Sequence, residues 1–348
     1  MLMLPLAMAS GRAADLQPIR LGAVPKAITP IMIDFVVGEY LGYYKQEGLT
    51  VQVLPLGSNA AAAAALASGR AEFYLAAPAF QIPLLVKGDT AGVDFYESTY
   101  PFKFALGVTP GSPVKTITDL KGKKVGVAAI GNSEYPVARA VLQLAGLDPD
   151  KDVSWISTGD GVAMAVALQR GDVDAVFTID TNWGLIESTG LKPTYLDMPK
   201  DLPQVGGVYV ATTPDILKNH RDWAVGFARA VAKSHIFIRE NPEAAAYIYG
   251  QMFPEAMPKG KDLQEQVQAA MVPIVKRMKL FVPSDPSISP PGSITKQEWA
   301  DEIKFGGLTG QVPDISALYT NDLVADINNF DPAVIKAQAD AFKLPYKN

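Results

Sequence analysis

The chain has 348 residues, and 48% of them are hydrophobic. It contains no cysteine and has a formal net charge of −5. This length suggests about two domains. The lack of cysteine excludes disulfides, thiolate nucleophiles, iron–sulfur clusters and a lipid-bearing cysteine. The acidic balance argues against a nucleic-acid-binding protein, which would show clustered Lys and Arg. Both histidines, His220 and His235, fall in a helical pattern and are interpreted as helix-surface or core-edge residues, so metal binding and histidine-based catalysis have little support.

The first segment, residues 1–14, is apolar, then small, then polar. This order is typical of the remnant of an export signal, although no basic segment precedes it. A frayed, alanine-rich terminus is the alternative. No later stretch approaches the roughly 20 consecutive apolar residues of a membrane span. The sequence therefore predicts an exported, soluble protein without an anchor.

The first strand is expected in "IRLGAV", and a helix follows in "ITPIMIDFVVGEYLGYY". Lys26 and Thr29 lie between them, in a turn bounded by two prolines. Both are candidate ligand contacts, because a lysine there would pair with an anionic solute. The alternative is an ordinary solvated loop lysine.

An internal repeat organises the chain at a constant offset of 102 residues, with Val51 matching Val153 and Gly69 matching Gly171. Each copy, 51–77 and 153–179, has a strand, a glycine-containing turn, an alanine-rich helix ended by glycine, and a second strand. Glycine suits the left-handed position after a helix. Two β-α-β units of related design therefore follow one another, as internal similarity of this kind indicates.

Further candidate contacts in the first half follow the strands of the first copy. Ser58 and Asn59 stand where the alanine helix begins, so they either only cap it or leave its free amide groups to bind an anion. Pro78 and Phe80 follow the second strand and offer close backbone approach and an aromatic wall. Phe80 fits the core face of the next helix equally well.

Two segments, 101–110 and 204–212, are expected to pass between the lobes. The predicted division is residues 15–104 with 208–348 in lobe one, and 105–207 in lobe two. The helices after residue 213 are expected to pack mainly on lobe one. Tyr209 either lines the cleft or packs the hinge, and Phe102 and Lys103 on the other crossing carry the same ambiguity.

The second half offers polar groups at matching positions. Pro136 is predicted at the first helical position of "GNSEYPVARAVLQLAG", with Tyr135 as the N-cap. Asn132, Ser133 and Tyr135 are predicted ligand contacts, while Glu134 has no assigned role. Asp160 is either a ligand contact or an acidic helix cap.

Asp180 and Trp183 follow a strand expected to be buried. Because an unpaired buried charge is costly, Asp180 needs a partner, either a donor on the ligand or a backbone amide. Trp183 offers either a stacking face or a core side chain.

The chain resembles the substrate-binding proteins of ABC importers, in the nitrate/sulfonate/thiamine-precursor group (NMT1/THI5-like, SsuA-like). The resemblance rests on "GYYKQEGLTVQV", "LASGRAEF", "DLKGKKVGV", "ARAVLQLAGLDPDKDVSWI" and "ALQRGDVDAVF" and covers roughly residues 19 to 250. It implies an α/β fold of the two-lobe, type II Venus flytrap class with a two-strand hinge. It also implies a periplasmic monomer that carries one small solute to a permease and its ATPase, with no cofactor, metal or catalytic residue.

Ligands of open α/β sheets bind outside the carboxyl ends of the strands. The ends expected at the cleft are 25–30, 57–59 and 77–80 in lobe one, and 131–135, 159–161 and 180–183 in lobe two. Helix starts at Ser58 and Ser133 favour an anion, whereas the acidic residues favour a ligand with N–H or O–H donors and the aromatic candidates favour a flat one. The predicted solute is a small sulfonate, carboxylate or aromatic compound. A pyrimidine-like N-heterocycle is the alternative, with an enzyme related to thiamine-pyrimidine synthesis far behind it.

Overall fold

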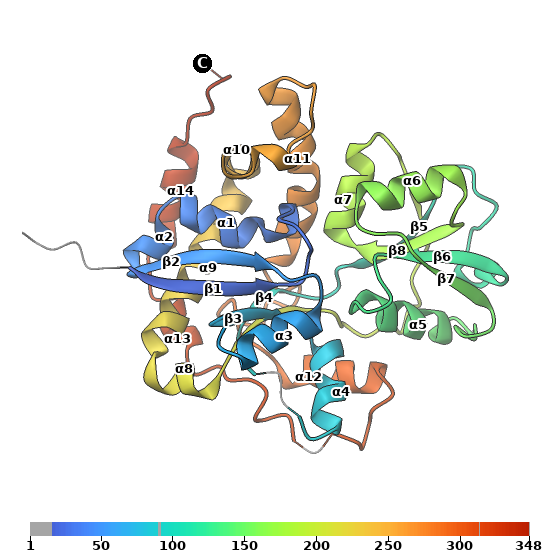
Figure 1. The fold of residues 1–348 in the computed structure, drawn as a ribbon, viewed down its shortest axis with the longest axis horizontal. Coiled ribbons are helices and arrows are strands. Elements are labelled where there is room, and N and C mark those ends of the chain that lie inside the picture. Colours follow the sequence, from blue (N-terminus) through green and yellow to red (C-terminus); the bar gives the residue numbers. More distant parts are fainter. Residues whose placement is uncertain (1–15, 90–91, 313, 348) are drawn as a thin grey trace, which may run out of the picture.

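The computed structural model describes residues 16–89, 92–312 and 314–347, so the predicted export signal at 1–14 lies outside the described residues. Two five-stranded sheets form two lobes that lie side by side (Figure 1). Lobe one is built on the sheet β2-β1-β3-β10-β4, with β1 (Gln17–Ala23), β2 (Leu49–Pro55), β3 (Phe73–Ala76), β4 (Val93–Thr99) and β10 (Val208–Thr212). Lobe two is built on β7-β6-β8-β5-β9, with β5 (Phe104–Val108), β6 (Lys123–Val127), β7 (Val153–Ser157), β8 (Ala175–Ile179) and β9 (Thr194–Tyr195).

The two sheets repeat one design, as the internal repeat predicted. In lobe one β1 pairs in parallel with β2 and β3, and in lobe two β6 pairs in parallel with β7 and β8. The acidic residue after each helix has the same task. Glu72 accepts a hydrogen bond from the backbone N–H of Arg20 at 2.7 Å, and Asp174 accepts one from that of Lys124 at 2.8 Å. The predicted two-lobe α/β fold is confirmed.

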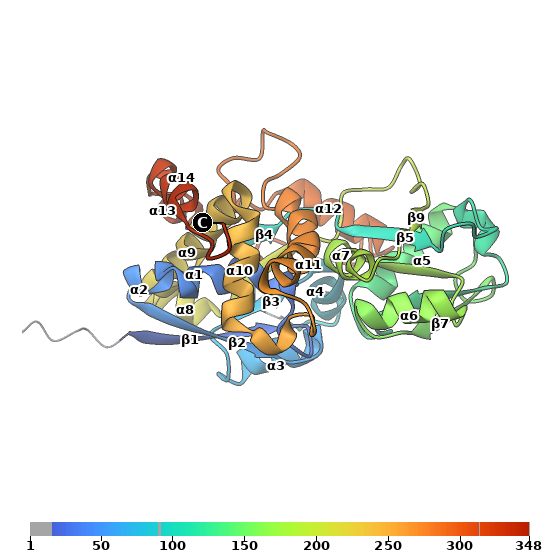
Figure 2. The ribbon, with the colours of Figure 1, turned by 90° about the horizontal axis from the view of Figure 1, so that it is seen from above.

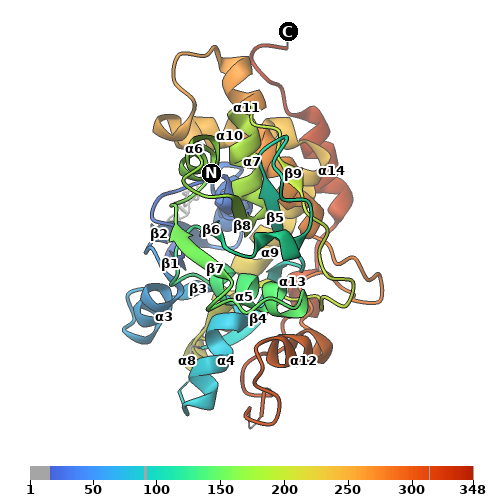
Figure 3. The ribbon, with the colours of Figure 1, turned by 90° about the vertical axis from the view of Figure 1, so that its right-hand side faces the viewer.

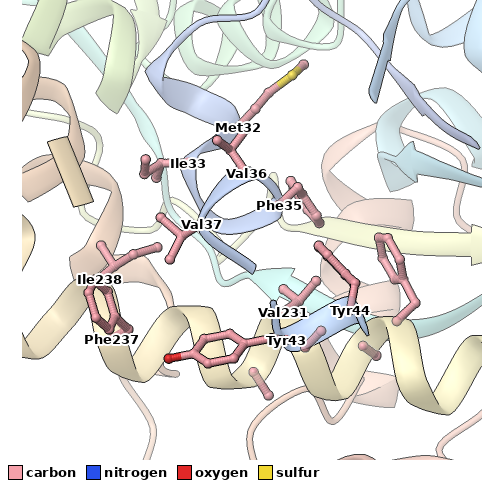
Figure 4. Close-up of a cluster of buried hydrophobic side chains, with 14 of the residues drawn as sticks. Met32, Ile33, Phe35, Val36, Val37, Tyr43, Tyr44, Val231, Phe237 and Ile238 are labelled. Atoms are coloured by element: carbon pink, nitrogen blue, oxygen red, sulfur yellow. The ribbon is translucent and has the colours of Figure 1, made fainter. Parts of the chain in front are cut away.

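Helices cover both faces of each sheet (Figures 1 and 3). Lobe two carries α5 (Glu134–Leu144), α6 (Val162–Arg170) and α7 (Asp180–Ser188). Lobe one carries α1 (Ile33–Tyr40), α2 (Tyr43–Gln46), α3 (Asn59–Ala67), α4 (Pro78–Val86), α8 (Pro214–Asn219), α9 (Arg221–Glu240), α10 (Pro242–Met252), α11 (Leu263–Arg277), α12 (Lys296–Phe305), α13 (Val324–Ile327) and α14 (Pro332–Ala341). The largest core of lobe one lies between α1 and α9, where Val37 of α1 faces Phe237 and Ile238 (Figure 4).

The chain crosses twice between the lobes, as the sequence predicted. After β4 it enters lobe two as β5, which lies antiparallel to β8. It returns to lobe one as β10, which lies antiparallel between β3 and β4. Each sheet is therefore completed by a strand that follows a crossing.

A third connection joins the lobes, and the sequence did not predict it. Helix α11 belongs to the lobe-one core through Val267 and Ile274, yet it also packs along α7 of lobe two (Figure 2). Pro273 lies directly over Gly184, and Lys276 forms an ion pair with Glu187 at 2.9 Å. The expectation that the late helices pack mainly on lobe one therefore missed this contact of α11.

Membrane insertion by a helix finds no support in the described ranges. None of the helices there combines the length and apolar character needed to cross a bilayer.

Candidate ligand-binding site

A cavity of about 320 Å³ lies between the two lobes. Residues from all six strand ends expected at the cleft contribute to its wall. They are joined by residues of the two crossing segments and by one residue of α11. The polar side chains that line it are Lys26, Asn59, Thr99, Lys103, Asn132, Ser133, Glu134, Asp160, Asn182 and Arg277.

The lobe-one wall combines apolar and polar groups. Met32 and Phe35, at the start of α1, are buried and supply an apolar surface. Asn59, the first residue of α3, is 3% exposed and lines the cavity. Lys26 reaches the same cavity from its exposed turn after β1. This wall therefore offers a solvated cation and an amide group beside an apolar floor.

Glu134 is the buried acid of the lobe-two wall. Its carboxylate is 4% exposed and accepts hydrogen bonds from the backbone N–H of Ala128 and, at 3.1 Å, from the hydroxyl of Thr178. Burial raises the pKa of Glu134 to about 7, against the lowering effect of those two hydrogen bonds. Each carboxylate oxygen keeps a second lone pair, so Glu134 is able to accept a further hydrogen bond.

The hydrogen bonds of Glu134 belong to a longer hydrogen-bond network across lobe two. The amide of Asn182 donates to the hydroxyl of Thr178 at 2.9 Å and to the carboxylate of Asp160 at 3.4 Å. This hydrogen-bond network thus runs from Asp160 through Asn182 and Thr178 to Glu134. Because every member is held by a neighbour, this wall presents its oxygen acceptors in fixed positions.

The hinge wall carries two buried cations. Arg277, at the end of α11, is 2% exposed and forms a bidentate ion pair with Asp180 of lobe two, with N–O distances of 2.6 and 2.8 Å. Lys103, in the first crossing, is 6% exposed and donates to the carbonyl of Gly206 and, at 3.2 Å, to that of Gly207 in the second crossing. Burial, and then the charge of Arg277, lower the pKa of Lys103 to about 8.

Five of the thirteen predicted contacts line the cavity. They are Lys26, Asn59, Asn132, Ser133 and Asp160. Of the remaining eight, two lie at helix starts and one forms an ion pair. Ser58 caps α3, with its hydroxyl accepting from the backbone N–H of Ala61 at 3.1 Å. Thr29 precedes the short helical turn 30–32, and Asp180 is bound to Arg277.

The other five predicted contacts pack elsewhere. Pro78 is the buried first residue of α4, and Phe80 packs on the core formed with α12. Tyr135 contacts Trp155 edge to face at 5.2 Å between ring centroids. Trp183 is 1% exposed and donates its indole N–H to the carbonyl of Ala105, and Tyr209 stacks on Trp299. The aromatic side chains that favoured a flat ligand therefore do not line this cavity.

The predicted start of α5 is wrong. The helix begins at Glu134 with Ser133 as N-cap, so Tyr135 and Pro136 lie inside its first turn. Proline is tolerated there because the first amide groups of a helix have no intrahelical partner. Tyr135 adopts the helical conformation that a following proline disfavours, and its contact with Trp155 stabilises it. This shift turns Glu134 toward the cavity.

The structure also identifies lining residues that the sequence did not assign. Glu134 was left without a role, and Asn182 and Arg277 were not considered. Asn182 lies within the predicted segment 180–183, so its position was available. Arg277 lies 94 residues after Trp183, the last predicted contact in lobe two, and nothing in its own segment "VPIVKRMKL" marks it.

Two lobes with a solute-sized cavity between matched strand ends define the periplasmic-binding-protein fold, and comparisons with known proteins agree. The chain belongs to the NMT1/THI5-like family, since the model described as "NMT1/THI5 like" matches residues 29–245. No curated protein matches it.

Three solved structures show the same fold. The alkanesulfonate-binding protein SsuA of Xanthomonas axonopodis pv. citri, bound to MOPS, is 15% identical with a TM-score of 0.62, covering 88% of this chain and 97% of that one. The periplasmic aliphatic sulphonate-binding protein SsuA of Escherichia coli is 20% identical with a TM-score of 0.60, covering 86% and 94%. The periplasmic nitrate-binding protein NrtA of Synechocystis PCC 6803 is 14% identical with a TM-score of 0.59, covering 95% and 99%.

Proposed function

We propose that this protein is the periplasmic solute-binding component of an ABC importer, and that it acts as a monomer. One observation carries the proposal: the cavity of about 320 Å³ is walled by all six expected strand ends, three from each lobe. Such a cavity fits a small organic solute, and ligand contact with both lobes favours the closed form. A permease and its ATPase would then recognise the closed form. The lobe boundaries proposed are 15–104 with 208–348, and 105–207, although Phe104 itself already pairs with Ile179 as the first residue of β5 in lobe two.

The proposed contacts are the polar residues that line the cavity from both lobes. Lys26 and Asn59 act from lobe one, and Asn132, Ser133, Glu134, Asp160 and Asn182 act from lobe two. Moving a lobe equilibrium from 1:99 to 99:1 needs roughly 5.5 kcal/mol of differential affinity. Several hydrogen bonds made only when both lobes contact the solute supply energy of that order.

The proposed solute is a small sulfonate or carboxylate. SsuA of two organisms binds sulfonates by its description, and the cationic residues of the hinge wall suit an anionic group. A pyrimidine-like N-heterocycle is the second candidate, favoured by the fixed oxygen acceptors of Glu134 and Asp160. An aromatic solute has less support, because Phe35 is the only aromatic side chain among the described residues that line the cavity.

We propose binding without turnover. The chain has no cysteine, and neither histidine lies on the described wall of the cavity. His235 is buried in lobe one, 3.3 Å from the carboxylate of Asp34, and His220 stacks on Trp223. Chemistry that depends on a thiolate or an imidazole would therefore lack its groups on the described wall of the cavity.

A thermal-shift screen tests this function. The purified protein is heated with methanesulfonate, butanesulfonate, MOPS, butanoate, nitrate and aminopyrimidine, each at several concentrations. We expect one chemical class to raise the melting temperature in a concentration-dependent way, because a ligand that binds only the folded state stabilises it. Calorimetry then measures the affinity, and chromatography checks that the solute is recovered unchanged. Consumption of the solute, or no shift with any class, contradicts the proposal.

A further inference from the structure

Lys103 differs from every other cation at the cavity. It is buried, it lines the cavity, and none of the ion pairs among the described residues includes it. Its ammonium donates to the carbonyls of Gly206 and Gly207, which leaves one of its three protons for another acceptor. Carbonyl oxygens satisfy its hydrogen bonds but do not neutralise its charge. A buried charge without a counter-charge is costly.

The two other cations of the cavity have their charge compensated in different ways. Arg277 is neutralised by Asp180 through a bidentate ion pair. Lys26 is exposed, so water stabilises its charge. Lys103 therefore contributes the excess positive charge of the hinge wall.

The acidic groups around Lys103 remove only part of this excess at pH 7. Glu302 of α12 accepts a hydrogen bond from the backbone N–H of Gly206 at 2.5 Å, and burial raises its pKa to about 7. Burial, together with the nearby Glu298, raises the pKa of Glu97 of β4 well above its ordinary value. Asp180 of α7 already holds Arg277. At pH 7 the group of Lys103, Arg277 and Asp180 thus carries a net positive charge that Glu302, with a pKa of about 7, offsets only in part, while the raised pKa of Glu97 favours its neutral form.

We propose that Lys103 is the specificity-determining cation of this protein, and that it selects a ligand with an anionic group. This inference rests on the proposed solute-binding function. The anionic group lies at the junction of the two crossings, where it accepts the remaining proton of Lys103. Because Lys103 already ties the first crossing to Gly206 and Gly207 of the second, the ligand's charge acts at the hinge itself.

The matched test compares Lys103→Met with Lys26→Met, two neutral variants of lysines on the same cavity. Butanesulfonate is the anionic probe and butanesulfonamide its neutral counterpart, with affinities measured by calorimetry at pH 7. We expect Lys103→Met to weaken butanesulfonate binding at least about 30-fold, as loss of a buried charge partner does. Lys26→Met should weaken it less than about 5-fold, because exposed pairs contribute little. Wild type should prefer the sulfonate over the sulfonamide.

A second measurement needs only the wild-type protein and so does not depend on the variant folding. The sulfonate stays ionised throughout, so its affinity should fall above about pH 8 as Lys103 loses its proton. The slope should approach roughly tenfold per pH unit, because the anion binds the protonated form. Residual binding by Lys103→Met should show a clearly smaller slope, which is the part that Glu302, with a pKa of about 7, contributes. Glu302, Glu97, Arg277 and Asp180 are present in both proteins, so the difference between the two slopes measures the contribution of Lys103.

Each contrary outcome overturns the inference. Equal affinity of wild type and Lys103→Met, a larger loss in Lys26→Met, or an affinity independent of pH up to 9.5 removes Lys103 as the selecting cation. Binding of aminopyrimidine and no anion also overturns it, while the solute-binding function stands. Binding of no solute in the screen overturns both, so the two failures are distinguishable.

Discussion

Gly184→Ala tests whether α11 holds the lobes together in the way the structure shows. A Cβ atom at position 184 would lie 2.4 Å from Cα and 2.7 Å from N of Pro273. These are backbone atoms of α11, so no rotamer change relieves the contact. Ordinary van der Waals contact begins at 3.4 Å, and α7 and α11 must therefore separate by about 1 Å. Overpacking of this kind costs about 1–3 kcal/mol.

Two measurements check this prediction. Urea denaturation should show a free energy of unfolding lower by about 1–3 kcal/mol in Gly184→Ala than in wild type. Gly131→Ala is the control, since a Cβ there meets nothing within 4 Å. Spin labels on cysteines introduced at the exposed positions Ala67 of α3 and Gln143 of α5 report the distance between the lobes, and the cysteine-free chain is labelled nowhere else. The label distances should broaden toward longer values. Unchanged stability together with unchanged distances would refute the role given to α11.

Two further substitutions test the buried charges of the cavity wall. Because the folded pKa of Glu134 is about 7 against an ordinary 4.5, wild type should lose roughly 3 kcal/mol of stability between pH 4.5 and pH 8 through this group. Glu134→Gln does not titrate, so its unfolding free energy should gain that amount relative to wild type over the same range, and parallel pH curves would contradict this. Asp180→Asn should cost about 3–5 kcal/mol by leaving Arg277 unpaired. In a double-mutant cycle with Arg277→Met the combined loss should be well below the sum, whereas additive losses would show that the ion pair contributes no coupling.

Local features of the fold were readable from the sequence because they depend on neighbouring residues. Gly69 and Gly171 end their helices with φ of 68° and 74°. Asn241 caps α10, and Thr295 with Glu298 forms a capping box at the start of α12. These motifs satisfy backbone groups within one turn, so a few residues suffice to specify them. The start of α5 is the exception, because packing of Tyr135 on Trp155, a residue of β7, outweighs its local preference.

Some features of the cavity were likewise predictable from the sequence, and others depend on long-range packing. The repeat located all six strand ends that form its wall, since parallel strands of one sheet end at one edge. Which side chain at each end faces the cavity was not readable. Serine and asparagine are neighbours at the start of α3, and only packing decides that Ser58 caps the helix while Asn59 lines the cavity.

The sequence by itself determined the two-lobe design, the order of its elements and the rim of the site. Periodicity, turn residues and an internal repeat each lie in contiguous stretches of the chain, so they can be recognised from the sequence without a structure. Only the tertiary structure decided the hinge chemistry. Arg277 meets Asp180 across 97 residues of chain, and Lys103 meets Gly206 across 103. Such contacts form where α11 and the two crossings bring distant segments of the chain together, and packing decides that Arg277 is paired with Asp180 while Lys103 has no ion-pair partner among the described residues.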